Sequence, residues 1–167
     1  MRRSRTGSPS TSTRTRLAVC LAAAAALAGG VAYRAIGRGG ARPLAWRDLS
    51  ARFAGWEFPQ PAFRIYQRAD TFAGFMRSEQ PGVRPPSPGV DFHHEEVVVL
   101  APGPRSSTGY GVRVLGVTGE RHRIVVDALE VTPSLGEAVR PGVTYPFMVI
   151  ALPRSGRTVT VHWQGNR

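Results

Sequence analysis

The sequence predicts a mainly β domain of the α+β class, preceded by an N-terminal hydrophobic helix. The domain is expected to be either an antiparallel β-sandwich or a sheet with one or two short helices packed against it. Three observations lead to this prediction. Apolar or alternating runs of strand length fill the second half of the chain, and short linkers rich in glycine and proline separate them. Helical spacing of apolar residues occurs in only two short segments. One long uncharged run lies near the N-terminus, directly behind a group of arginines.

Two of the strand-like runs are apolar throughout, and three alternate: residues 63–67, 121–131 and 158–163. Continuous apolar runs are typical of strands covered on both faces. The alternating run 121–131 places Ile124, Val126 and Ala128 on one face, and the last run turns Val159, Val161 and Trp163 inward. Because the linkers are short, we expect antiparallel pairing. Strands are expected at residues 63–67, 96–100, 111–117, 121–131, 147–152 and 158–163.

The two helical segments lie before the β-rich half. Residues 44–56 place Leu49, Phe53 and Trp56 at helical spacing. A second helix is expected over residues 71–78, with Asp70 as its N-cap.

The chain divides into four parts. Residues 1–16 form a basic segment expected in the cytoplasm, and residues 17–33 form either an uncleaved signal anchor or a signal peptide cut after Ala28. Residues 34–61 are expected to be a linker that contains the first short helix, and residues 62–167 the β domain. Either fate of residues 17–33 places the domain outside the cytoplasm. It would then be part of a single-pass membrane protein of the cell envelope, or secreted.

The net charge of +11 belongs mainly to the N-terminal segment. All 11 acidic residues lie from Asp48 onward, whereas eight of the 22 basic residues lie within residues 1–42. The remainder carries 14 basic and 11 acidic residues, a net charge of +3, so we expect no nucleic-acid partner. The single cysteine, Cys20, lies in the apolar run, so no disulfide can stabilise the domain.

No motif in the sequence assembles a reaction centre. The hydroxyl residues Ser106, Ser107 and Thr108 lack a G-x-S-x-G setting, and the segment His93 to Glu96 does not form H-E-x-x-H. Neighbouring histidines on a strand point to opposite faces, so His93 to Glu96 are expected as solvated residues at a strand edge. We therefore predict a protein that is not an enzyme, with no catalytic residues, no metal site and no cofactor.

Several short motifs resemble, in order and spacing, the C-terminal domain of the PrcB family, known from a protease complex subunit. They comprise Val90-Asp91-Phe92, Glu96 to Leu100, the turn cluster Gly103 to Val112, Val131-Thr132-Pro133, and Thr144-Tyr145-Pro146-Phe147 leading into Val149 to Pro153. The resemblance covers residues 62–163. It implies a non-enzymatic accessory domain outside the cytoplasm. Such a domain would bind and stabilise a cell-envelope protein partner such as a protease.

The turn cluster is the first candidate for contact with that partner, because a polar loop held between two strands is a common binding surface. Its candidate contact residues are Arg105, Ser107, Thr108, Gly109 and Tyr110. Gly109 is expected to supply a positive φ, and tyrosine gives a large contact area at low entropic cost. The second candidate segment comprises Tyr145, Pro146 and Phe147.

A second resemblance suggests an alternative function. Chagasin-type inhibitors are immunoglobulin-like β domains that insert a Thr-Thr-Gly-Tyr loop into the cleft of papain-like proteases. The segment Ser107-Thr108-Gly109-Tyr110 is similar, with serine in place of the first threonine. This resemblance implies a cysteine-protease inhibitor that acts through Thr108, Gly109 and Tyr110.

Overall fold

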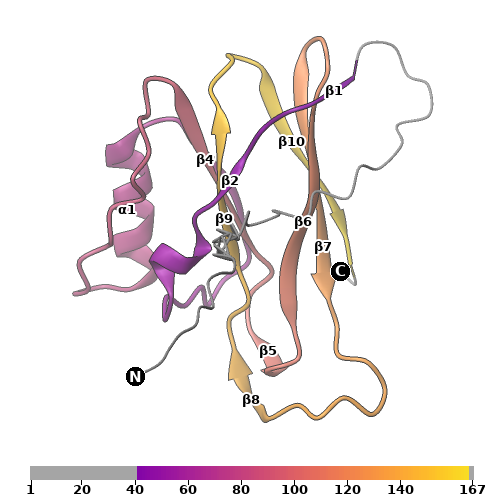
Figure 1. Cartoon of the computed structure of the whole chain (residues 1–167). Helices are drawn as coiled ribbons and strands as arrows, with labels where there is room; N and C mark the ends of the chain where they lie inside the picture. The colour runs from indigo at the N-terminus through magenta and orange to yellow at the C-terminus, as the bar shows by residue number, and fades with distance from the viewer. Residues whose placement is uncertain (1–40, 166–167) are drawn as a thin grey trace, which may run out of the picture.

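Two four-stranded sheets face each other in the computed structural model, which describes residues 41–165 (Figure 1). Sheet A has the order β1 (Arg42–Pro43), β6 (Gly111–Gly119), β7 (Arg123–Val131) and β10 (Thr158–Gln164). Sheet B has the order β2 (Arg47–Asp48), β9 (Met148–Pro153), β4 (Glu95–Ala101) and β3 (Ala62–Tyr66). A small third sheet pairs β5 (Arg105–Ser107) with β8 (Pro141–Thr144). The predicted mainly β fold of packed sheets is confirmed, and all strand pairs except β7 with β10 are antiparallel.

The basic segment 1–16 and the predicted hydrophobic helix at residues 17–33 lie outside the described residues. Within residues 41–165, no helix has the length and apolar character needed to cross a membrane.

The strands β4 and β9 are covered on both faces. Val98 and Leu100 of β4 point toward sheet A, whereas Val97 and Val99 point to the other side, which α1 (Ala69–Glu79) and a 3-10 helix, η1 (Ser50–Phe53), cover. Figure 1 shows the resulting order of layers, with α1 on the left, sheet B in the middle and sheet A on the right. Double coverage explains why these two strands are apolar throughout.

Apolar side chains fill the space between the sheets. The alternation predicted for residues 121–131 and 158–163 is confirmed, because β7 buries its even-numbered apolar residues and β10 turns its odd-numbered residues inward. The buried residues of this inner core are Val98, Leu100, Ile150 and Leu152 from sheet B and Val114, Val117, Ile124, Val126 and Ala128 from sheet A.

An aromatic cluster lies on the other side of sheet B. The Phe72 ring of α1 makes edge-on contacts with Phe53 and with Tyr66, at centroid distances of 5.8 and 5.5 Å. Burial in this cluster raises the pKa of Tyr66 to about 12. Edge-on aromatic pairs add to the free energy of burial, so this cluster fixes α1 on the sheet.

The helix α1 begins one residue before the predicted cap. Arg68 occupies the N-cap position without a capping side-chain hydrogen bond, and Asp70 lies inside the first turn. The Asp70 carboxylate accepts hydrogen bonds from the Thr71 amide at 2.8 Å and from the Arg68 guanidinium, which lowers its pKa to about 2. An acidic group in the first turn stabilises the helix dipole, so Asp70 acts by charge and not as the predicted cap.

The segment 44–56 is not the regular helix that its spacing suggested. It contains the short strand β2 and the single-turn helix η1, and Leu49, Phe53 and Trp56 are all buried against sheet B. The strand β1 pairs with β6 and β2 pairs with β9, so part of the expected linker contributes to both sheets. The backbone hydrogen bonds of β1 and β2 with the two sheets therefore determine the local structure, although three apolar residues have helical spacing.

The expectation of uniformly antiparallel pairing is wrong for the last strand. β10 runs parallel to β7, with Thr158 opposite Arg123 and Gln164 opposite Leu129. The chain leaves sheet A after β7, forms β8 and β9, and then returns to sheet A. This excursion lets β10 enter in the same direction as β7, as a parallel pair requires.

Glu96 lies on the inner face of β4 and is fully buried, which corrects the expectation of a solvated residue. One carboxylate oxygen accepts a hydrogen bond of 3.0 Å from Gln67, and the other has no partner among the described residues. Burial raises the pKa of Glu96, although the hydrogen bond from Gln67 and the charge of Arg154 act in the opposite direction.

Because the pKa of Glu96 is raised, its contribution to the stability of the fold depends on pH. Because the folded chain holds this proton more tightly than the unfolded chain, the stabilisation is complete below the ordinary pKa of glutamate. It is lost as the pH rises through the raised value. We therefore expect Glu96→Gln to raise the free energy of unfolding at pH 8 by about 1 kcal/mol and to leave it nearly unchanged at pH 4. Thermal unfolding across this pH range, with the exposed Glu57→Gln as control, measures the effect. Equal shifts at both pH values would contradict the assignment.

Candidate partner-binding surface

The structure brings the two predicted contact segments together at one end of the sandwich (Figure 1, bottom). β5 pairs with β8, with Arg105 opposite Thr144 and Ser107 opposite Pro141. This small sheet continues the pairing of β4 with β9 after a short break, because β5 follows β4 and β8 precedes β9 in the chain. Two core strands therefore hold the predicted loop in place.

Arg105 is committed to an internal ion pair. Its guanidinium contacts the buried Glu130 carboxylate of β7 and also donates to the carbonyl oxygens of Pro102 and Pro104, at 3.2 and 3.0 Å. The hydrogen bond with Glu130 raises the pKa of Arg105. The Arg105 side chain is 22 % exposed and that of Glu130 only 2 % exposed, so the pair joins β5 to β7 below the surface.

Ser107 and Thr108 also use their polar groups internally. Ser107 is buried, and its carbonyl oxygen accepts a hydrogen bond of 2.7 Å from the Thr144 hydroxyl. The Thr108 amide donates to the Arg140 carbonyl, and the Thr108 hydroxyl accepts from the Arg140 amide, both at 3.1 Å. These bonds fix the turn against the loop that leads into β8.

Gly109 is required for a different reason from the one predicted. Its φ is not positive; instead, a Cβ atom built at this position would lie 2.5 Å from Val139 and 2.7 Å from Pro133. Only a glycine allows the backbone to approach this closely. Tyr110, Tyr145 and Pro146 are half-buried, whereas the Phe147 ring packs on Phe58 at 5.1 Å and belongs with the helix-side core.

The most exposed apolar side chains at this end belong to residues outside the two predicted contact segments. Leu135 is 108 % exposed and Val143 is 68 % exposed. Leu135 sits in a hydrogen-bonded turn: the Glu137 amide donates to the Ser134 carbonyl at 3.0 Å, and the Ser134 amide donates to the Glu137 carboxylate at 2.8 Å. Gly136 takes the left-handed conformation that this turn needs, with φ of 84°.

We call Tyr110, Leu135, Val143 and Tyr145 the tip surface. Val143 lies in β8, and the other three lie in the segments next to β5 and β8, two strands that Figure 1 shows at one end of the molecule. The two aliphatic side chains are exposed and the two tyrosines are half-buried. Isolated exposed leucines are ordinary, but several apolar and tyrosine side chains on hydrogen-bonded segments at one end of a domain are typical of a protein-binding surface. The sequence signal for Leu135 is its place between Ser134 and Gly136 in a turn, where no core can receive it.

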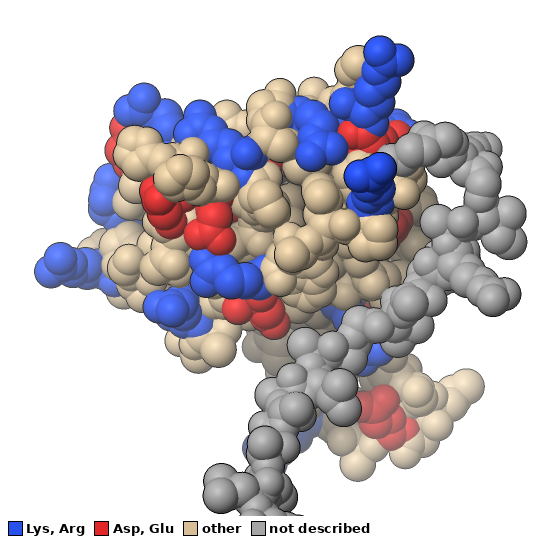
Figure 2. All heavy atoms as spheres, turned by 45° about the horizontal axis from the view of Figure 1, so that its top comes forward, with Lys and Arg blue, Asp and Glu red and all other residues tan. Residues whose placement is uncertain are grey.

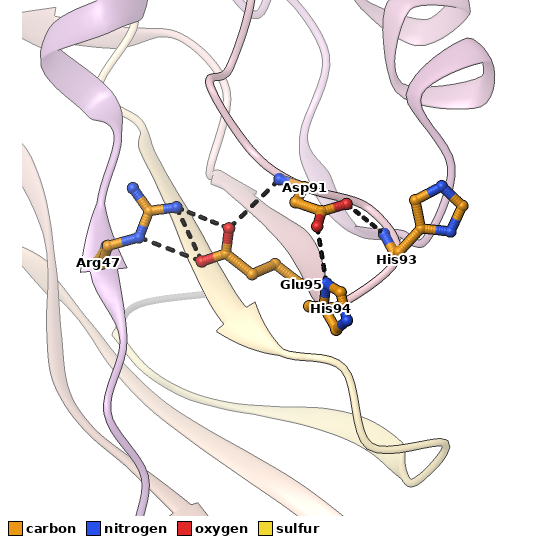
Figure 3. Close-up of polar contacts among 5 residues, drawn as sticks. All are labelled: Arg47, Asp91, His93, His94 and Glu95. Carbon is orange, nitrogen blue, oxygen red and sulfur yellow. Dashed lines mark hydrogen bonds and ion pairs between the residues drawn. The ribbon is translucent and has the colours of Figure 1, made fainter.

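A polar cluster lies where the chain enters β4 (Figure 3). Arg47 of β2 donates to both carboxylate oxygens of Glu95, with its closest contacts at 2.8 Å. The Asp91 carboxylate accepts from the His93 amide at 2.9 Å and contacts His94 Nδ1 at 2.7 Å, and these contacts lower the pKa of Asp91. His93 and His94 lie in the turn before β4 and not on a strand. The cluster fastens β2 and this turn to β4.

The described residues bring no reactive set together. None of the hydrogen bonds in the part of the chain that the structure describes joins a serine or threonine hydroxyl to a histidine; the two paired histidines contact Asp91 and Asp127. In the same part, no group of three histidine, cysteine, aspartate or glutamate residues has the spacing for a metal ion.

The charges at the end opposite the tip surface are mixed. Figure 2 shows arginine side chains scattered over this face with acidic side chains between them. A surface that follows a nucleic-acid backbone usually presents a continuous basic patch. Together, the fold and the contacts define a β-sandwich module whose polar groups mainly stabilise its own loops.

The family model described as PrcB C-terminal matches residues 97–153, the segment from β4 to β9 that contains the β5–β8 sheet and Leu135. The resemblance to the PrcB family predicted from the sequence is therefore confirmed over this segment, and it supports an accessory-domain role. Comparisons with curated proteins and with solved structures gave no significant match.

The close approach at Gly109 leads to a stability prediction. We expect Gly109→Ala to lower the free energy of unfolding by about 1–3 kcal/mol, because the new methyl group must displace Val139 or Pro133. Gly74→Ala in α1 is the matched control: its Cβ meets nothing within 4 Å, so better helix propensity should stabilise the domain by about 0.5–1 kcal/mol. Chemical denaturation measures both changes. A loss of stability at Gly74 equal to that at Gly109 would contradict the packing argument.

The ion pair between Arg105 and Glu130 gives a second prediction. Arg105→Ala leaves the Glu130 carboxylate buried without its cation, so we expect a loss of about 2–3 kcal/mol in the free energy of unfolding. Arg123→Ala breaks the exposed pair with Glu120 and should change stability little. Urea unfolding of the two variants measures both changes. Equal losses in the free energy of unfolding would show that the buried pair contributes no more to stability than the exposed pair.

Proposed function

We propose that this chain is a non-enzymatic accessory protein whose β-sandwich binds a cell-envelope protein partner through the tip surface. The observation that carries the proposal is the display of Leu135 and Val143, both strongly exposed, on the hydrogen-bonded frame around β5 and β8. The match of residues 97–153 to the PrcB C-terminal family supports an accessory role.

The hydrogen bonds that hold the segments of the tip surface favour binding. Leu135 is held by a closed turn, and β8 is held by β5 and by the bonds between Thr108 and Arg140. A preorganised apolar contact loses little conformational entropy on association, so its burial can contribute to affinity. Tyr110 and Tyr145 would add contact area from stiff side chains.

The proposed class of partner is a protease of the cell envelope, which the domain would assist or stabilise. The family resemblance supports this choice, since the family takes its name from a protease complex subunit. The location outside the cytoplasm is supported by the sequence of residues 1–33, which has arginines before an uncharged run.

The alternative of a cysteine-protease inhibitor receives no support from the geometry of the loop. An inserted loop must present its residues to a cleft, but Thr108 is bonded to Arg140 and Gly109 lies against Pro133 and Val139. Inhibition of papain by the purified protein at micromolar concentration would favour this alternative over the accessory role.

Substitution of Leu135 tests the tip surface. Affinity capture from the envelope of the producing cell, followed by mass spectrometry, identifies proteins bound by the wild-type chain; their affinities are then measured with purified components. Loss of one buried leucine costs about 2 kcal/mol of binding free energy, so we expect Leu135→Asp to weaken binding about thirtyfold or more.

Val83→Asp is the matched control, because Val83 is an exposed valine in the proline-rich loop after α1 and lies outside the tip surface. It should leave both folding and binding unchanged. Partner affinities that are equal for wild type and Leu135→Asp would remove the tip surface from the proposal.

A further inference from the structure

A second surface lies at the edge of sheet A. β10 is the outermost strand and pairs with β7 over its whole length, from Thr158 to Gln164. No strand of the described residues pairs with its other side. Alternate residues of a strand direct their backbone N–H and C=O groups toward each side, so the free side carries a row of unpaired donors and acceptors.

The free side of β10 lacks the features that usually protect an edge strand. Its sequence, Thr-Val-Thr-Val-His-Trp-Gln, contains no proline and no lysine, and its pairing with β7 has no bulge. Natural sheets use such features to prevent unwanted strand addition. Their absence here makes β10 a ready template for a further strand.

A hollow opens beside β10 on the inner face of the sheet. It has a volume of about 400 Å³ and lies between β10 and the end of β3, with Ile65 and Val159 in its wall and Gln67 and Arg157 at its polar side. The Gln67 side chain donates a hydrogen bond to the buried Glu96 carboxylate. At the same edge, the half-exposed Phe63 contacts the Trp163 ring at a centroid distance of 4.9 Å. The sandwich is therefore not fully closed on this side, and apolar surface remains accessible.

A second hollow, of about 470 Å³, lies on the outer face of the same strand. Thr158 and Thr160 border it together with Arg121 and His122 from the turn between β6 and β7 and Arg123 at the start of β7. Arg123 is paired with Glu120, which also borders this hollow, whereas Arg121 is exposed and adds positive charge. This hollow suits an acidic side chain.

Both hollows include Thr158, one on each face of the strand. Successive side chains of an extended strand point to opposite faces, so a strand added beside β10 would direct its side chains alternately to the two hollows. We propose that β10 accepts an extended segment of a protein partner in which apolar and acidic residues alternate. Backbone hydrogen bonds to β10 would provide affinity, and the two hollows would select the side chains.

The charge at the outer hollow favours a foreign segment over a second copy of this chain. In a pairing of β10 with another β10, the outward side chains would be Thr158, Thr160 and His162. None of them is acidic, so they would leave the positive charge of Arg121 unmatched, whereas Arg123 already has Glu120 as its partner. The proposal does not depend on the tip surface, because none of the residues that border the two hollows belongs to it. Leu135→Asp should therefore leave the binding of an extended segment unaffected.

Labelled peptides test the proposal with the full-length chain. The probe is a capped octapeptide of alternating valine and glutamate, and its counterpart replaces glutamate with lysine. We expect the acidic peptide to bind about tenfold more tightly than the basic one by fluorescence anisotropy. Hydrogen exchange followed by mass spectrometry should show new protection in residues 158–164 when the acidic peptide is bound.

Two controls separate charge from backbone pairing. Arg121→Glu should reverse the preference between the two peptides, whereas Arg84→Glu, the same change in the loop after α1, should not. An acidic peptide that is N-methylated at alternate residues should not bind, because it cannot pair with an edge strand. Equal binding of both peptides, a lack of protection in residues 158–164, or protection caused by self-association without peptide would overturn the proposal.

Discussion

The structure depends on the burial of β4 and β9 on both faces. Val97 and Val98 are successive residues of β4, yet one packs beneath α1 and the other packs against sheet A. The two antiparallel strands thus belong to two cores at once, and each core fixes the position of the other. The chain continues from β4 into β5 and enters β9 from β8, so the pairing extends to the end of the molecule near Leu135 and Val143.

The parts of the fold that could be predicted are those in which a residue's neighbours in sequence decide its environment. The apolar runs of β4 and β9 and the alternation of β7 indicate burial on two faces or on one, and the structure agrees. The parallel direction of β10 could not be predicted, because it depends on the path of the chain through sheet B. The strand β5, with the sequence Arg-Ser-Ser, carries no apolar pattern and exists because β8 lies beside it.

In the candidate site, too, local features could be predicted from the sequence, whereas contacts between distant residues could not. The glycine and hydroxyl residues around positions 105–110 predicted a turn between two strands, and the structure has a turn there, between β5 and β6. The sequence could not show that Arg105 finds Glu130, 25 positions away, or that Gly109 must make room for Val139. The polar side chains of Arg105 and Thr108 are therefore engaged in an ion pair and hydrogen bonds within the domain. The exposed apolar residues Leu135 and Val143 lie instead in the loop before β8 and in β8 itself.

The return of the chain from sheet B to sheet A has a consequence for biosynthesis. β7 is made about thirty residues before β10, and β8 and β9 must be placed in between. Until β10 is synthesised, the side chains of Ile124 and Val126 lack their neighbours on that strand, so closure of the sandwich waits for residues 158–164. A chain truncated before Thr158 would lack β10 and would expose apolar side chains of sheet A. Such a chain would be prone to aggregation and degradation.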